Sequence, residues 1–363
     1  MPDTNTPKDS RILVINPGST STKVAVFCGE TPEVETVIRH AHDAFEDARG
    51  ILGQKEARTA LVLDFLKANE IDPATLDCVV GRGGLVRPIE SGTYAVNDKM
   101  IRDLQRGSAG THASSLGGII AAEVAGKYGL PAFVVDPVVV DEMEPVARLS
   151  GIPGVERRSV FHALNTKAVA RVAAERLGVQ YEDGRFVVAH MGGGISVGAH
   201  RYGRVIDVSD ALGGEGPFSP ERCGSVPVRA VIEMCFSGQY SQDEMLSMVN
   251  RQGGMLAYLG TNDFMAVERM IRGGDEFATL VMDSMAYQVS KEIGAMAAVL
   301  EGRLHAILLT GGLANSTRFC GAIKQRVDQI APVLTLPGEE EMLALARGAL
   351  RVLRGEERLM EYT

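Results

Sequence analysis

The sequence predicts an α/β protein built from two similar domains. The chain has 363 residues, which is too long for one typical hydrophobic core. Short apolar runs typical of buried strands alternate with longer segments whose apolar residues have helical spacing. A strand, a polar or glycine-rich turn and a second strand occur in each half. We therefore expect one domain at 1–155 and a second at 156–363, whose terminal helix can alternatively pack back on the first domain.

The two strand–turn–strand segments can be aligned with each other. Residues 11–21 read RILVINPGSTS, and residues 185–195 read RFVVAHMGGGI. Aligning Asn16 with His190 gives an offset of 190 − 16 = 174 residues, close to half of the chain. A tandem duplication that places a phosphate-binding hairpin at the start of each copy explains this match most simply. A chance match of two short segments is the alternative.

The remaining elements are expected from apolar periodicity and from the residues that end each run. Gly178 closes an alanine-rich helix, and Pro137 stops the strand that leads to Asp136. The expected strands are 12–15, 23–27, 78–80, 132–135 and 305–309, and residues 185–200 are expected to form a strand, a glycine turn and a second strand. The expected helices are 57–68, 112–128, 164–177, 277–300 and 340–353.

Composition and charge exclude several classes of protein. The net charge of −9, without a basic run, disfavours a nucleic-acid partner. The polar first eleven residues predict no signal peptide, and no apolar run of membrane-spanning length occurs. The five cysteines are scattered and form no C-x-x-C pair, so we expect reduced thiols and a cytoplasmic protein.

The first hairpin, residues 16–23, reads NPGSTSTK and is rich in hydroxyl groups. Backbone N–H groups in such turns form concavities that bind anions, and Lys23 adds a positive charge. An ordinary hairpin is the alternative, because these residue types favour turns in any case.

The second hairpin contains His190, Met191 and three consecutive glycines, Gly192, Gly193 and Gly194. Without Cβ atoms, this turn lets a phosphate lie against the backbone, and His190 can donate to a phosphate oxygen. A buried structural histidine is the alternative reading.

Residues 194–198 also match the G-x-S-x-G pattern of serine hydrolases. That pattern requires a helix directly after the serine, whereas the sequence beyond Ser196 continues as strand. The hydrolase order of residues leaves only His305 as the base, inside an apolar run. We therefore reject the hydrolase reading.

Neither a Walker loop nor a full G-x-G-x-x-G motif is present. ATP would therefore have to be bound by the paired hairpins. The segment 308–315, LLTGGLAN, has the strand, glycine turn and helix start that suit the nucleoside end, with Gly311, Gly312 and Asn315 in the turn.

Taken in order, these motifs resemble the acetate kinase family, and most closely its butyrate kinases. The resemblance extends from residue 11 to beyond residue 340. It rests on VINPGSTSTK at 14–23, GRGGLVRP at 81–88, FH at 161–162, AHMGGG at 189–194, ERCG at 221–224 and TGG at 310–312. It implies duplicated ribonuclease H-like domains of the actin and hexokinase type, with a cleft between them that closes over the substrates.

The resemblance also implies roles for individual residues. The active-site arginines correspond to Arg82 and Arg222; planar guanidinium groups suit the spread negative charge of a transferring phosphoryl group. The alternative for each is a surface ion pair. The catalytic aspartate corresponds to Asp136, with Asp141 as the weaker candidate, and the phosphoryl-contacting histidine to His162. The nucleotide and phosphate sites correspond to Asn16, Ser19, Ser21, Lys23, His190, Gly192, Gly193, Gly194, Gly311, Gly312 and Asn315.

A metal-linked glutamate in this family corresponds to the run Glu339, Glu340 and Glu341. We assign Asn16 and Glu340 to Mg²⁺, although the register is uncertain by one position. An exposed helix start is the alternative for these glutamates.

The expected reaction is reversible, direct in-line transfer of the γ-phosphate from Mg·ATP to a carboxylate, giving an acyl phosphate and ADP. Where acetate kinases carry bulkier residues, this chain has Gly83 and Gly84 after Arg82. We expect this change to widen the acyl pocket, so that butyrate or a branched acid is preferred. An acetate or propionate kinase and a non-metabolic ATPase of the same fold are the alternatives. The resemblance also favours a homo-oligomer, with apolar helices such as 277–300 at the interface.

Overall fold

The computed structural model describes residues 10–18, 20–40, 51–107 and 113–363, and its contacts divide the chain into two compact units. Unit 1 contains residues up to Val140 together with Glu340–Thr363, and unit 2 contains Asp141–Glu339. The boundary expected from the sequence was residue 155. The contacts place the boundary earlier, between Val140 and Asp141 and therefore before α4 (Pro145–Arg148). They also place the last helix, within Glu340–Thr363, in unit 1.

Unit 1 is built on a seven-stranded sheet with the order β12-β5-β6-β4-β1-β2-β3. The antiparallel part is β1 (Arg11–Pro17), β2 (Ser21–Cys28) and β3 (Thr31–Arg39). β4 (Cys78–Arg82) and β6 (Ala132–Val135) extend the sheet in parallel to β1. The short strands β5 (Thr93–Ala95) and β12 (Met360–Glu361) complete the edge.

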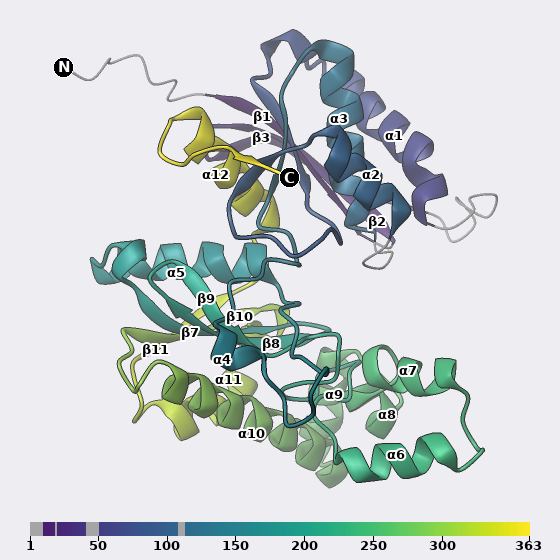
Figure 1. The fold of residues 1–363 in the computed structure, drawn as a ribbon, viewed down its shortest axis with the longest axis vertical. Coiled ribbons are helices and arrows are strands. Elements are labelled where there is room, and N and C mark those ends of the chain that lie inside the picture. Colours follow the sequence, from purple (N-terminus) through teal and green to yellow (C-terminus); the bar gives the residue numbers. More distant parts are fainter. Residues whose placement is uncertain (1–9, 19, 41–50, 108–112) are drawn as a thin grey trace. The chain divides into compact units, whose positions relative to one another are not determined.

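Helices cover both faces of this sheet (Figure 1). The helices α1 (Lys55–Ala68), α2 (Asp98–Arg106) and α3 (Ser115–Tyr128) lie on one face, and α12 (Glu341–Leu353) lies on the other. Leu13 and Ile15 alternate along β1 and pack against Val62 of α1 and Ile120 of α3. This period of two is the strand signature that the sequence shows.

Unit 2 contains a five-stranded sheet with the order β11-β10-β7-β8-β9. The antiparallel strands are β7 (Arg185–Met191), β8 (Ile195–Arg201) and β9 (Arg204–Val208). β10 (Ala306–Gly311) and β11 (Val333–Pro337) continue the sheet in parallel to β7. The order therefore repeats that of β1, β2, β3, β4 and β6 in unit 1, as a duplication predicts.

The helices of unit 2 also form two layers. α10 (Glu276–Val299) and α11 (Thr317–Val327) share a core with alternate residues of β7, and α5 (Ala163–Leu177) packs on the other face. The helices between β9 and α10 are α6 (Val228–Phe236), α7 (Gln242–Asn250), α8 (Gly254–Leu259) and α9 (Phe264–Arg272). Within the described ranges, none of the helices has the length and apolarity to cross a membrane.

Candidate active site

In unit 1, the candidate residues gather where three parallel strands end. Ile15 of β1 lies opposite Gly81 of β4, and Arg82 lies opposite Val135 of β6. Asn16, Arg82 and Asp136 therefore follow one another along the same edge of the sheet. The carboxyl ends of parallel strands are where open α/β sheets bind ligands.

Glu341 joins two of these residues. Its Oε2 accepts hydrogen bonds from Asn16 Nδ2 at 2.7 Å and from Arg82 Nη1 at 3.0 Å. Arg82 Nη2 lies 2.9 Å from Glu341 Oε1, so the guanidinium and carboxylate form a two-point pair. Glu340, which the sequence analysis assigned to the metal, is exposed at the start of α12. Within the glutamate run, Glu341 is therefore the member that reaches Asn16 and Arg82.

Asp136 is buried and held by backbone contacts. Its Oδ1 accepts a hydrogen bond from the Gly92 N–H at 2.8 Å, and its own N–H donates to the Gly92 carbonyl. The backbone of Asp136 has a φ of +38°, which is unusual for a residue with a side chain. The weaker candidate, Asp141, belongs to unit 2, where Arg148 donates to both of its carboxylate oxygens.

The β1–β2 hairpin rests on a buried arginine that the sequence analysis missed. Arg58 of α1 is 0% exposed, and its Nη1 donates to the Gly18 carbonyl at 2.9 Å and to Thr22 Oγ1 at 2.9 Å. Ser21 offers its carbonyl to the same nitrogen at 3.3 Å. Lys23 lies opposite Asn16 in the register of the hairpin, on the same face. Ser19 lies outside the described residues.

In unit 2, two histidine rings stack beside the glycine hairpin. The ring centroids of His162 and His190 are 3.8 Å apart, with 16° between their planes. His162 Nδ1 lies 3.0 Å from Ser196 Oγ, and His190 Nδ1 lies 2.8 Å from Asn165 Oδ1. Because the Asn165 oxygen can only accept, this contact places a proton on His190 Nδ1.

The remaining nitrogen of His190, Nε2, is buried. It lies 3.2 Å from Glu339 Oε1, without the alignment of a hydrogen bond. The position of a Cβ on Gly192 would be 3.1 Å from the same carboxylate oxygen and 3.4 Å from His190 Nε2. The absence of a side chain at this position therefore leaves the imidazole edge open toward the turn.

Arg222 lies directly against the third glycine of the hairpin. A Cβ on Gly194 would be 1.8 Å from Arg222 Nη1, so only glycine permits this packing. Arg222 Nη1 donates to the Ala211 carbonyl at 2.8 Å, and burial lowers the pKa of the guanidinium from its ordinary value. Its Nε is buried and has no hydrogen-bond partner among the residues that the structure describes.

The candidate nucleoside turn follows β10 at the same edge of the sheet. Thr310 lies opposite His190, and Gly311 has a φ of +89°. A Cβ on Gly311 would be 2.4 Å from the Met191 carbonyl oxygen, so this turn packs against the end of β7. Gly312 and Asn315 belong to the short helix that follows, in which Asn315 Nδ2 donates to the Gly312 carbonyl.

Ser196 does not have the geometry of a hydrolase nucleophile. It is buried inside β8, and the chain continues as strand β9 rather than as a helix. The histidine beside it is His162, whereas the ring nitrogen of His305 accepts the N–H of Arg185. This environment agrees with the rejection of the serine hydrolase interpretation. The histidine that contacts Ser196 is His162, however, whereas the sequence analysis considered His305 as the base.

Comparisons with known proteins agree with this arrangement. The model of the acetokinase family matches residues 151–347, which is more than half of the chain. The chain belongs to the acetokinase family. Enzymes of this family transfer a phosphoryl group between ATP and a carboxylate, generally with Mg²⁺.

Solved structures show the same duplicated ribonuclease H-like fold. The acetate kinase of Porphyromonas gingivalis is 20% identical, covers 94% of this chain and 99% of its own, and has a TM-score of 0.77. The acetate kinase of Entamoeba histolytica is 19% identical, with coverages of 93% and 98% and a TM-score of 0.75. A propionate kinase from Francisella tularensis is 20% identical, with coverages of 93% and 98% and a TM-score of 0.72.

Proposed function

We propose that this acetokinase-family protein phosphorylates the carboxylate of butyrate or of a related short or branched fatty acid. The observation that carries the kinase chemistry is Arg222, a half-buried guanidinium held against the side-chain-free turn that follows His190. A planar cation next to a turn without side chains suits the equatorial oxygens of a transferring phosphoryl group. The preference for butyrate rests on the ordered motifs in the sequence.

Gly83 and Gly84 do not widen the acyl pocket in the way that the sequence analysis expected. A Cβ on Gly83 would lie 2.6 Å from Pro137 Cβ, and one on Gly84 would lie 2.3 Å from Ser115 Cα. These glycines allow close packing instead of leaving empty space beside Arg82. Any additional room for a longer acyl chain must therefore come from other residues.

In the proposed mechanism, arginines and histidines position and neutralise the reacting groups. In unit 2, Arg222 binds the transferring phosphoryl group, and the Nε2 edge of His190, whose orientation Asn165 fixes, lies toward the glycine turn. Because Nδ1 carries a proton, Nε2 donates to a phosphate oxygen only when the ring carries a second proton. In unit 1, Arg82 binds an anionic oxygen of the reactants. Transfer is direct and in line, because positioning and charge neutralisation suffice for this reaction.

Mg²⁺ enters this proposal as part of the substrate Mg·ATP. Within the described ranges, no three acidic, histidine or cysteine side chains gather as metal ligands. Mg²⁺ is often held by one or two carboxylates, substrate phosphates and waters, so this donor set fits a nucleotide-bound ion. Asn16 and Glu341 would hold it, and it would neutralise charge on the phosphates.

The test is acyl phosphate formation, trapped with hydroxylamine, on acetate, propionate, butyrate, isobutyrate and isovalerate with Mg·ATP. We expect the highest kcat/KM on butyrate or a branched acid. A higher value on acetate or propionate would support the second candidate, which the similar solved structures favour. Hydrolysis of ATP without acyl phosphate would place the protein among the ATPases.

We also propose a homo-oligomer in the cytoplasm. Val228, Ile232 and Phe236 follow one another every four residues along α6 and are 68%, 52% and 86% exposed. Such an apolar stripe on one helix face suits burial against a second copy. All five cysteines are free thiols, which suits a reducing compartment. Light scattering of wild-type protein and of Phe236→Ser tests the assembly.

A further inference from the structure

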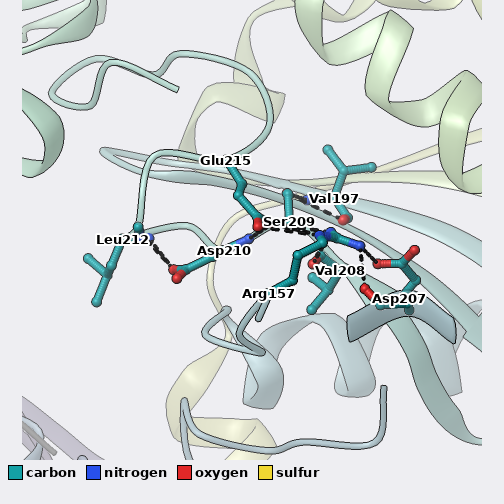
Figure 2. A network of polar contacts seen from close by, with 10 residues as sticks. Arg157, Val197, Asp207, Val208, Ser209, Asp210, Leu212 and Glu215 are labelled. Carbon is teal, nitrogen blue, oxygen red and sulfur yellow. Dashed lines mark hydrogen bonds and ion pairs between the residues drawn. The ribbon is translucent and has the colours of Figure 1, made fainter. Parts of the chain in front are cut away.

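Arg157 lies in the segment before α5, and its guanidinium is completely bonded (Figure 2). Nε and Nη2 donate to the carboxylate of Glu215, with Nη2 at 3.1 Å from Oε2. Nη1 donates to Asp207 Oδ1 at 2.8 Å and to the Ala147 carbonyl at 3.0 Å. Nη2 also donates to the Val208 carbonyl at 3.1 Å. Arg157 thus connects the end of β9 with the loop that follows it.

Glu215 holds the other end of this loop. Its Oε2 accepts the Asp210 N–H at 3.2 Å, and Asp210 Oδ1 accepts the N–H groups of Leu212 and Gly213, both at 2.8 Å. The Ala211 N–H donates to the Val160 carbonyl at 2.9 Å. These bonds fix the backbone on both sides of Ala211 and hence the direction of its carbonyl.

That carbonyl is one of two anchors of Arg222. Arg222 Nη1 donates to it at 2.8 Å, and Gly194 forms the wall against which the guanidinium lies. If the 207–215 loop shifts, the guanidinium loses the contact that fixes its rotation. A misplacement of about 1 Å in a phosphoryl-binding group can reduce a rate about 100-fold.

The charges around Arg157 are expensive to bury. Burial raises the pKa values of Asp207, Asp210 and Glu292 above their ordinary values, although hydrogen bonds and nearby arginines oppose the shift. Buried ion pairs often contribute less to stability than apolar packing of the same volume. A function in positioning is therefore a better explanation for this cluster than stability alone.

We propose that Arg157 and Glu215 are positioning residues for the reaction, acting on Arg222 through the Ala211 carbonyl. The proposal rests on the proposed function, because it assumes that Arg222 binds the transferring group. The alternative is that the cluster only supports the fold of unit 2.

The test is a double-mutant cycle with Arg157→Lys and Arg222→Ala, read as kcat for acyl phosphate formation. Lysine keeps the charge but has three donors in place of five, so it cannot hold the loop at all its contacts. We expect Arg157→Lys to lower kcat about 100-fold in the wild-type background, with KM for ATP changed less than about threefold. In the Arg222→Ala background, the same change should lower kcat less than about twofold.

Glu215→Gln is the milder second variant, because glutamine keeps an acceptor oxygen, and it replaces Arg157→Lys if that variant does not fold. We expect a smaller loss of kcat from Glu215→Gln, and this loss should again nearly disappear in the Arg222→Ala background. Glu144→Gln is the matched control: Glu144 pairs with Arg201 in the same unit and is 39% exposed, against 30% for Glu215. We expect its kcat to be unchanged. Added guanidinium should partly rescue Arg222→Ala but not the double variant.

Equal losses in both backgrounds, or equal rescue of the single and double variants, would overturn the positioning role while leaving the kinase assignment intact. If the wild-type protein makes no acyl phosphate, the proposed function fails instead, and the same cycle is read on ATP hydrolysis. If the effects of the two substitutions on the rate of ATP hydrolysis are coupled, Arg157 acts through Arg222. If the two effects are additive, this link is overturned.

Discussion

The β1–β2 and β7–β8 hairpins occupy equivalent places in two sheets of the same order, yet each is associated with an arginine in a different way. Arg58 Nη1 donates to carbonyl and hydroxyl oxygens of the first hairpin, and its Nε and Nη2 donate to Gln54 Oε1. The Arg58 side chain is completely buried. Arg222 lies against a hairpin that offers it no side chain, and its buried Nε has no partner within the described ranges. The first arginine supports a loop, whereas the second has bonding capacity left for a ligand.

This difference shows what duplication preserved and what it left free to change. The strands and their order are shared, while the turns differ in composition: hydroxyl-rich in unit 1 and glycine-only in unit 2. The turn of the β1–β2 hairpin contains side chains and is held in place by the hydrogen bonds of Arg58. The glycine turn of the β7–β8 hairpin has no side chains, which leaves space for Arg222 to lie against it. Four substitutions test this comparison.

The largest effect is expected for Arg222→Ala. If the free bonding capacity of Arg222 serves the phosphoryl group, kcat should fall by about 10³–10⁵-fold while KM for ATP changes much less. Steady-state kinetics with hydroxylamine trapping measures both. Equal losses in kcat and in ATP affinity would mean that the residue merely binds the nucleotide.

A smaller loss, about 100-fold in kcat, is expected for Gly194→Ala. The new Cβ would collide with the end of a flexible side chain, so the guanidinium should move and the backbone should not. The thermal unfolding midpoint should therefore change little. Gly294→Ala in α10 is the control, because nothing lies within 4 Å of its added Cβ, and it should retain full activity. Unchanged kcat in Gly194→Ala would remove the steric link to Arg222.

Arg58→Met should affect stability more than it affects the chemical step directly. It leaves buried oxygens of the first hairpin without a donor, which costs about 1–3 kcal/mol in the free energy of unfolding. Chemical denaturation measures this loss. If Arg58→Met is as stable as wild type but inactive, Arg58 acts on the ligand and the contrast between the two arginines is wrong.

The smallest effect is expected for Asp210→Asn. Burial raises the pKa of Asp210 above its ordinary value of 3.8, so the folded state binds a proton more readily than the unfolded state. The associated stability is present below pH 3.8 and is lost as the pH rises through the elevated value. Asparagine keeps the acceptor oxygen but does not titrate, so the free energy of unfolding of the variant should fall less steeply with pH over this interval. Unfolding curves at several pH values measure the slope; a slope equal to that of wild type would exclude this contribution.

The sequence predicted the sheets well because strand signals are local. The apolar runs before Asn16 and before His190 became β1 and β7, and the 174-residue match corresponds to equivalent hairpins in the two units. Residues directly after strands were also accessible to prediction. Asn16, Arg82 and Asp136 each end or follow a strand, and parallel strands bring such positions together.

Contacts between distant segments were not accessible in this way. Arg58 lies on the buried face of α1 beside Val62 and Phe65, and a charged residue at an apolar helical position was the signal that could have revealed it. Asn165 follows His162 by three residues in an alanine-rich helix, a similar clue. Nothing local distinguishes Glu341 from Glu340, because the choice depends on where α12 meets β1 and β4.

The position of Glu341 along the chain has a consequence for synthesis. The strands that present Asn16 and Arg82 are translated before all of unit 2, whereas α12 follows it. At about 5–20 residues per second, the ribosome leaves unit 1 without that helix for some tens of seconds. During this interval one face of its sheet lacks the helix that covers it, and Arg82 lacks the carboxylate with which it pairs in the folded protein.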